Sequence, residues 1–205
     1  GVPAYRLLGG RFRDRIRVYA DTPESPEPRI AAERLQARMN RGIGFLKMDL
    51  GADLLRDVPG ASCAPSGLAP GDLRHTQHMF TGIELTDQGI AHLCSYVAHV
   101  RNEIGYEIPL ALDHFGHIGV NSCIRLGKAL EAYNPAWLED MIPWQQTELW
   151  KRITQSVHVP TCTGEDIYLK EGFAALLRER AVDITHPDLA TSGGMMETKK
   201  IGDMA

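Results

Sequence analysis

From residue 108 onward, the chain repeats a short apolar run followed by a segment whose apolar residues have helical spacing. The apolar runs cover 108–113, 136–139, 159–165 and 182–188, and the helical segments cover 124–133, 146–155, 169–179 and a stretch that starts near Met196. Short apolar strands that alternate with amphipathic helices are typical of βαβ units and a parallel sheet. The second half of the chain therefore predicts an α/β fold.

The first half carries two further units of this kind. Alternating polar and apolar residues predict a strand over 15–20, and helical spacing predicts a helix over 29–41. Another short apolar run covers 44–50, and after an irregular region rich in Gly, Pro and Ser a helix is predicted from Thr86, a suitable N-cap. Six units fit either an open doubly wound sheet or a TIM-type (β/α)8 barrel that is incomplete, with strands one to about six present.

Composition narrows the functional classes. The 205 residues are 43% hydrophobic and carry a net charge of −4, which excludes a disordered or collagen-like chain. The mild acidity, without a Lys/Arg run, argues against nucleic acid as a partner, and no apolar stretch approaches the roughly 20 residues of a membrane span. The four cysteines lack metal-finger spacing (Cys63, Cys94, Cys123 and Cys162). They are interpreted as reduced thiols of a cytoplasmic protein.

Acidic residues stand at the ends of the four later strands. Asp113, Glu139 and Glu165 are spaced 26 residues apart, and Asp188 follows 23 residues after Glu165. One βα unit of a barrel takes about this length, since eight units need roughly 250 residues. The alternative is that these acids are helix caps or solvated loop residues. The regular period instead favours a ring of carboxylates at the carboxyl-terminal mouth of the barrel. Oxygen-only ligands are typical of a hard divalent cation, and Mg²⁺ in particular leaves positions for substrate oxygens.

Two other residues are candidates for this mouth. Lys47 and Asp49 lie two apart on the predicted strand 44–50 and so share a face, where a charged pair is costly without a role. Lys47 is a candidate base or carboxylate-binding cation, the alternative being a strand-end lysine that reaches solvent. His186, which precedes Pro187 at a strand end, could reach the site, but a hydrogen-bonded structural histidine is the simpler interpretation.

These residues, in this order, resemble the barrel portion of the enolase superfamily, in its mandelate racemase/muconate lactonizing enzyme branch. The matching motifs are the opening residues 1–10, Lys47, Asp113, Trp137-Leu138-Glu139-Asp140, Gly164-Glu165, His186-Pro187-Asp188 and Ser192-Gly193-Gly194. Each motif alone is weak, but the ordered set is specific and extends over nearly the whole chain.

The resemblance implies that Asp113, Glu139 and Glu165 bind Mg²⁺, and that Asp188 orients a catalytic histidine on the next strand, expected beyond Ala205. It implies that residues 1–14 are the junction from an N-terminal capping domain, and that the barrel domain, 15–205, ends before strands seven and eight. The implied partner is a small-molecule carboxylate, a sugar acid, with no nucleic acid or membrane, and the implied assembly is a homo-oligomer.

The departures from the branch favour one reaction. Asp49 stands where the branch often carries the second lysine of a Lys-x-Lys pair, so a racemase with two opposed bases is disfavoured. We expect Mg²⁺-dependent removal of the proton α to a carboxylate, followed by dehydration of a sugar acid to a 2-keto-3-deoxy acid. The alternatives are a racemase, epimerase or cycloisomerase of the same superfamily, and a non-catalytic barrel homologue.

A histidine after Asp113 is a further catalytic candidate. Some acid-sugar dehydratases carry a catalytic histidine two residues past this metal ligand, a position that Phe115 holds here. His117, or else His114, could take that role if the strand end bulges.

Overall fold

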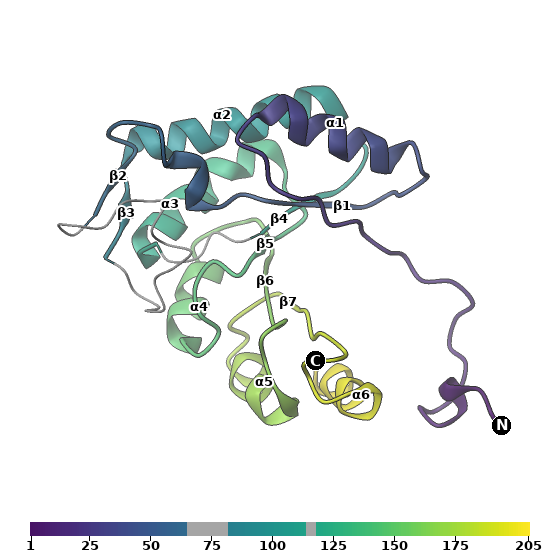
Figure 1. Cartoon of the computed structure of the whole chain (residues 1–205). Coiled ribbons are helices and arrows are strands. Elements are labelled where there is room, and N and C mark those ends of the chain that lie inside the picture. Colours follow the sequence, from purple (N-terminus) through teal and green to yellow (C-terminus); the bar gives the residue numbers. More distant parts are fainter. Residues whose placement is uncertain (65–81, 114–117) are drawn as a thin grey trace.

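The computed structural model describes residues 1–64, 82–113 and 118–205, and in this part of the chain a parallel sheet carries helices on its outside (Figure 1). The strands of the sheet are β1 (Leu46–Asp49), β4 (Leu110–Asp113), β5 (Leu138–Glu139), β6 (Thr161–Thr163) and β7 (Ile184–Thr185). The α-helices are α1 (Pro28–Met39), α2 (Asp87–Ile104), α3 (Val120–Leu130), α4 (Thr147–Thr154), α5 (Leu169–Arg178) and α6 (Met195–Met204). Short 3₁₀ turns are η1 (Ala4–Arg6), η2 (Ala52–Leu55) and η4 (Glu131–Tyr133), and β2 (Ser62–Cys63) pairs antiparallel with β3 (Glu84–Leu85).

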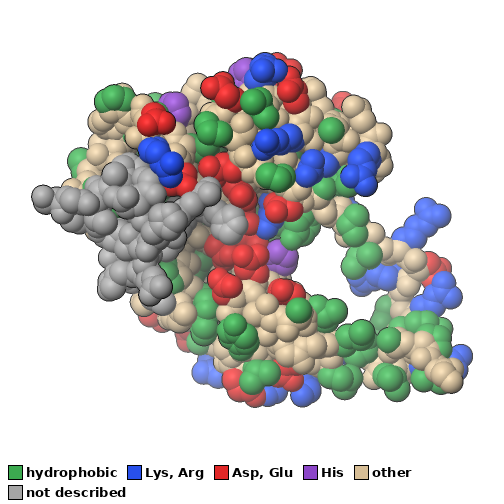
Figure 2. All heavy atoms as spheres, viewed as in Figure 1, with side chains coloured by type: hydrophobic (Ala, Val, Ile, Leu, Met, Phe, Trp, Pro, Cys, Tyr) green, Lys and Arg blue, Asp and Glu red, His purple; other side chains and the backbone are tan. Residues whose placement is uncertain are grey.

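The sheet order distinguishes between the two predicted architectures. The strands are neighbours in chain order, β1-β4-β5-β6-β7, and every pairing is parallel. A doubly wound sheet reverses its strand order at a switch point, whereas a barrel wall does not. The α/β prediction is thus confirmed, and the order is that of a barrel wall. This wall curves around a hollow, visible as the recess in the centre of Figure 2.

The first predicted strand, over 15–20, is wrong for most of its length. Only Ala20 reaches the sheet, where it forms a parallel bridge to Leu46, the first residue of β1. The Ala20 amide donates to the Phe45 carbonyl at 3.0 Å, and the Ala20 carbonyl accepts from the Lys47 amide at 2.9 Å. Ile16 and Val18 are 72% and 60% exposed, so the alternating pattern has no apolar layer to pack against here.

The predicted helices are confirmed, with boundaries displaced by a few residues. Thr86 caps α2 as expected, because its hydroxyl accepts a hydrogen bond from the Gly89 amide at 3.1 Å. Consecutive helices pack against one another, α1 on α2, α2 on α3, α3 on α4 and α5 on α6. In the described part of the chain, no helix is long and apolar enough to cross a membrane.

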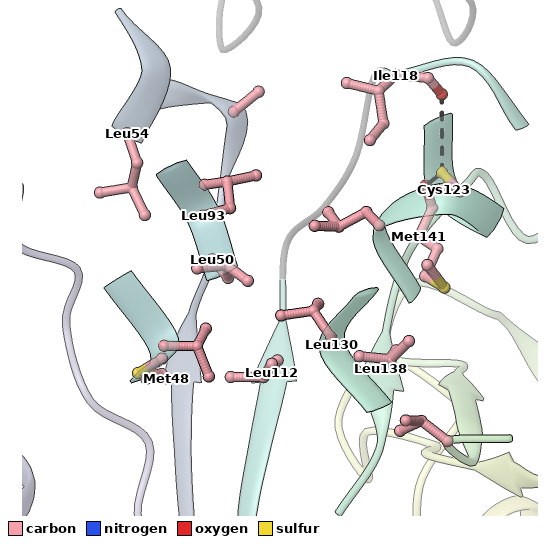
Figure 3. Packing of buried hydrophobic residues seen from close by; sticks show 14 of the residues in the cluster. Met48, Leu50, Leu54, Leu93, Leu112, Ile118, Cys123, Leu130, Leu138 and Met141 are labelled. Atoms are coloured by element: carbon pink, nitrogen blue, oxygen red, sulfur yellow. Dashed lines mark hydrogen bonds between the residues drawn. The ribbon is translucent and has the colours of Figure 1, made fainter. Parts of the chain in front are cut away.

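The hydrophobic core lies between the strands and the helices. Alternate strand residues, among them Met48, Leu112 and Leu138, face outward and pack against Leu93 of α2 and Leu130 of α3 (Figure 3). The intervening positions on the inner face are different in kind: they are Lys47, Ala111, Asp113, Glu139 and Cys162. A two-residue period therefore separates an apolar face that holds the fold together from an inner face that carries the charged residues Lys47, Asp113 and Glu139.

Candidate active site

The charged side chains gather at the carboxyl-terminal edge of the sheet. Asp113 and Glu139 are the last residues of β4 and β5, Glu165 follows β6 by two residues, and His186 comes directly after β7. Figure 2 shows acidic side chains concentrated in the hollow, with a basic side chain and a histidine beside them. The spacing of the acids along the sequence therefore corresponds to a common height on neighbouring strands.

Lys47 is at the centre of this group. Its ammonium group hydrogen-bonds to Asp113 Oδ2 and lies 3.3 Å from Glu139 Oε2. All three residues are buried, with Lys47 4% exposed and each acid 1% exposed. Burial alone lowers the pKa of Lys47, but the hydrogen bond to Asp113 and the charges of both acids outweigh it and raise that pKa above its ordinary value. The site thus holds Lys47 as a cation.

Glu139 is held through both of its carboxylate oxygens. Its Oε2 accepts a hydrogen bond from Trp137 Nε1 at 2.7 Å, and its Oε1 lies 2.6 Å from His186 Nδ1. Burial raises the pKa of Glu139, but His186, Lys47 and Trp137 together lower it below its ordinary value. Glu139 is therefore a fixed carboxylate with donors on both oxygens.

His186 links Glu139 to the segment before β1. Its Nε2 lies 2.9 Å from the Tyr19 hydroxyl, and its hydrogen bond to Glu139 raises the pKa of the imidazole against the effect of burial. Gly164 allows β6 and β7 to approach here, since its φ is +144° and a Cβ would lie 3.0 Å from the His186 amide nitrogen. The predicted structural histidine is thus hydrogen-bonded, as expected, but inside the candidate site.

Asp140 adds a carboxylate to the site that the sequence pattern does not assign to it. Oxygens of Asp113, Glu139 and Asp140 all lie within 4.8 Å of one another. Asp140 has a left-handed backbone, with φ of 48°, and accepts a hydrogen bond from Thr163 Oγ1 at 2.6 Å. Burial first, and then the neighbouring acids Asp113, Glu139 and Glu165, raise the pKa of Asp140 to about 7. This local excess of negative charge is an arrangement that a bound cation relieves.

Glu165 is at the same edge but farther from the others. It is half-buried, and among the described residues it is not in a group of ligand atoms as close as Asp113, Glu139 and Asp140. Its charge still raises the pKa values of Asp140 and His186. The structure therefore brings two of the three predicted metal ligands together with Lys47, and places the third beside them.

The remaining predicted catalytic residues have other positions. Asp188 is exposed after β7, where it accepts hydrogen bonds from the Ala190 amide at 2.8 Å and from Thr191 Oγ1 at 3.1 Å. These bonds lower the pKa of Asp188. His117, and the alternative His114, lie outside the described residues.

A cavity of about 510 Å³ lies at the opposite, amino-terminal edge of the sheet. It is lined by residues that directly precede the strands, such as Phe45, Pro109 and Pro160, and by the buried Arg101. The acids lie at the other edge, but Trp137 also lines this cavity and donates to Glu139, so this residue borders both the cavity and the candidate site.

Sequence reasoning missed four members of the site. Trp137 and Asp140 enter the sequence interpretation only as parts of one motif, Cys162 only as a reduced thiol, and Tyr19 has no assigned role. Trp137 precedes Glu139 by two residues and so shares its face of β5, which is a signal the sequence offered. The contact of Tyr19 with His186 joins residues 167 positions apart, and no local pattern marks it.

Comparisons with known proteins show what this chain is similar to. Residues 30–205 match the family described as enolase C-terminal domain-like. The chain is 37% identical to a D-xylonate dehydratase of Haloferax volcanii and 29% identical to a D-galactonate dehydratase of Variovorax paradoxus. Each alignment covers 100% of this chain, but only 45% and 46% of the two relatives.

Solved structures show the same fold. A mandelate racemase/muconate lactonizing enzyme-like protein from Rubrobacter xylanophilus superposes with a TM-score of 0.81 at 28% identity, over 100% of this chain and 51% of that protein. The chain thus spans about half the length of the relatives and structures it matches. The predicted barrel architecture and the predicted superfamily are confirmed by these matches.

Proposed function

The chain belongs to the enolase C-terminal domain-like family, and on that premise we propose that it takes part in the Mg²⁺-dependent dehydration of a sugar acid to a 2-keto-3-deoxy acid. The observation that carries the proposal is the buried group of Lys47, Asp113 and Glu139 at the carboxyl edge of the barrel wall. The relatives named as D-xylonate and D-galactonate dehydratases support a sugar acid as the substrate class.

The donor set fits a hard divalent cation. Asp113, Glu139 and Glu165 are the proposed ligands, all of them carboxylates at one edge, and Asp140 adds negative charge next to the first two. Lys47 and His186 neutralise only part of this charge, and carboxylate oxygens are what Mg²⁺ prefers. When bound, the ion supplies Lewis-acid stabilisation of the negative charge that develops on the substrate carboxylate.

The side chains of this chain take the remaining proposed roles. Lys47, held as an ammonium ion, attracts the substrate carboxylate and orients it beside the acids. Asp188 is proposed to orient the histidine that removes the α-proton, and His117 to protonate the β-hydroxyl as it leaves as water. Asp49 stands on β1 where a second lysine would serve as the opposing base, so the proposed base acts from one side of the substrate only. With one base, loss of the β-hydroxyl is favoured over return of the proton to the opposite face.

The proposal is tested by incubating the full-length protein with a panel of sugar acids and Mg²⁺ and assaying for 2-keto-3-deoxy acids. We expect such a product from at least one acid, and none when Mg²⁺ is chelated. An inverted stereocentre without loss of water would instead indicate an epimerase, and binding without turnover would indicate a non-catalytic homologue.

Glu165→Gln is the variant that tests the ligand assignment, because it removes a charge with almost no change in shape. We expect loss of both Mg²⁺ binding, measured by calorimetry, and turnover. Glu103→Gln, at an exposed position on α2, is the matched control and should retain both. Full activity of Glu165→Gln would refute the assignment of Glu165 as a ligand.

A further inference from the structure

A second group of potential ligands overlaps the carboxylates. Ligand atoms of Glu139, Cys162 and His186 all lie within 4.8 Å of one another. Cys162 is in register with Glu139 on the neighbouring strand β6, and its side chain is fully buried at 0% exposure. This group therefore offers one oxygen, one sulfur and one nitrogen donor on the inner face of the wall.

The two oxygens of Glu139 face different sides of the site. Oε2 is the oxygen near Trp137 and Lys47, whereas Oε1 is the oxygen next to His186 Nδ1, at 2.6 Å. The donors on the histidine side of Glu139 are thus different in chemistry from the all-carboxylate group of Asp113, Glu139 and Asp140.

The imidazole is already oriented for ligation. The Tyr19 hydroxyl lies 2.9 Å from Nε2, so Nδ1 points toward Glu139 and the hollow. A metal-binding histidine usually makes a hydrogen bond through its second ring nitrogen, and this bond fixes the ring and its tautomer. Tyr19 is in the position of such a partner.

Cys162 differs from the other buried thiol of the chain. The Sγ of Cys123 lies 3.2 Å from the Met141 carbonyl oxygen and 3.9 Å from the Ile118 carbonyl oxygen, the contact drawn in Figure 3, on the helix side of the sheet. Cys162 instead pairs in register with Glu139 on the neighbouring strand, and its Sγ lies within 4.8 Å of ligand atoms of Glu139 and His186. Only Cys162 is grouped with other ligand types among the described residues.

We propose that Glu139, Cys162 and His186 form a second cation site, which takes a borderline-soft divalent ion of the Zn²⁺ class. A set of one nitrogen, one sulfur and one carboxylate oxygen is typical of Zn²⁺ and Co²⁺ sites, and is not favoured by Mg²⁺. Because Glu139 belongs to both groups, the soft ion and the hard ion compete, and Zn²⁺ inhibits any Mg²⁺-dependent reaction at this mouth. The competition, but not the site itself, rests on the proposed function.

Cobalt is the probe, since a thiolate bound to Co²⁺ gives a charge-transfer absorption band in the near ultraviolet that oxygen ligands do not give. The full chain, kept reduced and free of Mg²⁺, is titrated with Co²⁺. We expect the band in the wild type and in Cys123→Ser, which controls for loss of a buried thiol, and no band in Cys162→Ser. Absence of the band in the wild type, or its persistence in Cys162→Ser, overturns the proposal.

His186→Gln provides a second variant in case Cys162→Ser does not fold. It leaves the thiol, so the band should remain, but Co²⁺ affinity should fall by about tenfold or more. Unchanged affinity would exclude His186 as a ligand and overturn the three-ligand site. Excess Mg²⁺ should bleach the band if Glu139 is shared, and an unaffected band would refute the competition. None of these readouts needs turnover, so they stand or fall independently of dehydratase activity.

Discussion

At the scale of single residues, the site depends on how Glu139 is held. A buried carboxylate without donors costs several kcal/mol, but Glu139 has Trp137 and His186 on its two oxygens and the Lys47 ammonium 3.3 Å away. These contacts both offset its desolvation and fix the direction of its free lone pairs. A fixed carboxylate binds a metal ion with less loss of conformational freedom than a mobile one.

Trp137→Phe should weaken metal binding while leaving the fold intact. The phenyl ring keeps most of the contact with Phe45 and Tyr19, but the hydrogen bond from Nε1 to Glu139 is lost. Loss of such a partner of a ligand costs about 10–100-fold in metal affinity. Calorimetric titration with Mn²⁺ measures the effect. Trp144→Phe, which alters an indole packed against the hydrophobic core, is the control, and an equal effect of both substitutions would rule out the positioning role.

The residue scale also shows where sequence reasoning ends. The spacing of Asp113, Glu139 and Glu165 predicted that these acids lie together at one edge of the sheet, and the structure places all three there. The reason is that parallel strands from βα units of equal length end at the same height. The contacts of Tyr19 with His186, and of Cys162 with Glu139 across β5 and β6, depend on strand register. Register is set by the whole sheet, and for that reason no local pattern reports it.

At the scale of elements, periodicity predicted the helices well because each of them covers one apolar face. The strands are shorter than predicted, and the run over 15–20 reaches the sheet only at Ala20. A strand needs a neighbour to satisfy its backbone, and alternation alone does not supply one. Local periodicity also does not predict the burial of Arg101 on α2. Its side chain is 2% exposed and donates to the carbonyls of Tyr133, Ile108 and Asn134.

The hydrogen bond between α2 and the segment before α1 offers a test of how contacts between elements stabilise the fold. The Tyr96 hydroxyl donates to the Ser25 carbonyl at 2.6 Å, and Tyr96 is 4% exposed. Tyr96→Phe should cost about 1 kcal/mol of unfolding free energy, since it leaves a buried carbonyl without this donor. Urea denaturation measures the loss, and Tyr168→Phe, at an exposed position, should cost nothing measurable.

The same tyrosine predicts a pH dependence. Burial raises the pKa of Tyr96 from 10.0 to about 12. Between these values the unfolded chain releases the phenolic proton while the folded chain retains it, so the stability of the folded state falls as the pH rises through this interval. Tyr96→Phe should remove that part of the alkaline slope. Identical slopes in the wild type and the variant would contradict the assignment.

At the scale of the whole molecule, charge is distributed unevenly. The net charge is only −4, yet the hollow concentrates the acids at the carboxyl ends of β4, β5 and β6 against Lys47 and His186. The apolar outer face of the wall stabilises the fold, while the inner face holds like charges together at a cost. A ligand that binds only the folded chain and neutralises those charges should therefore stabilise the entire domain.

Mg²⁺ should raise the thermal unfolding midpoint for this reason. At a concentration 100 times its dissociation constant, a ligand that binds only the folded state adds about 2.7 kcal/mol of stability, or roughly 5–10 °C for a chain of this size. Calorimetry of the chelator-treated protein, with and without Mg²⁺, measures the shift. NaCl at equal ionic strength should give a much smaller shift, because screening acts weakly on buried charges. In Glu139→Gln the Mg²⁺-dependent shift should vanish, whatever the midpoint of that variant without Mg²⁺. Equal shifts from NaCl and Mg²⁺ would mean that general screening, and not a bound ion, relieves the repulsion in the hollow.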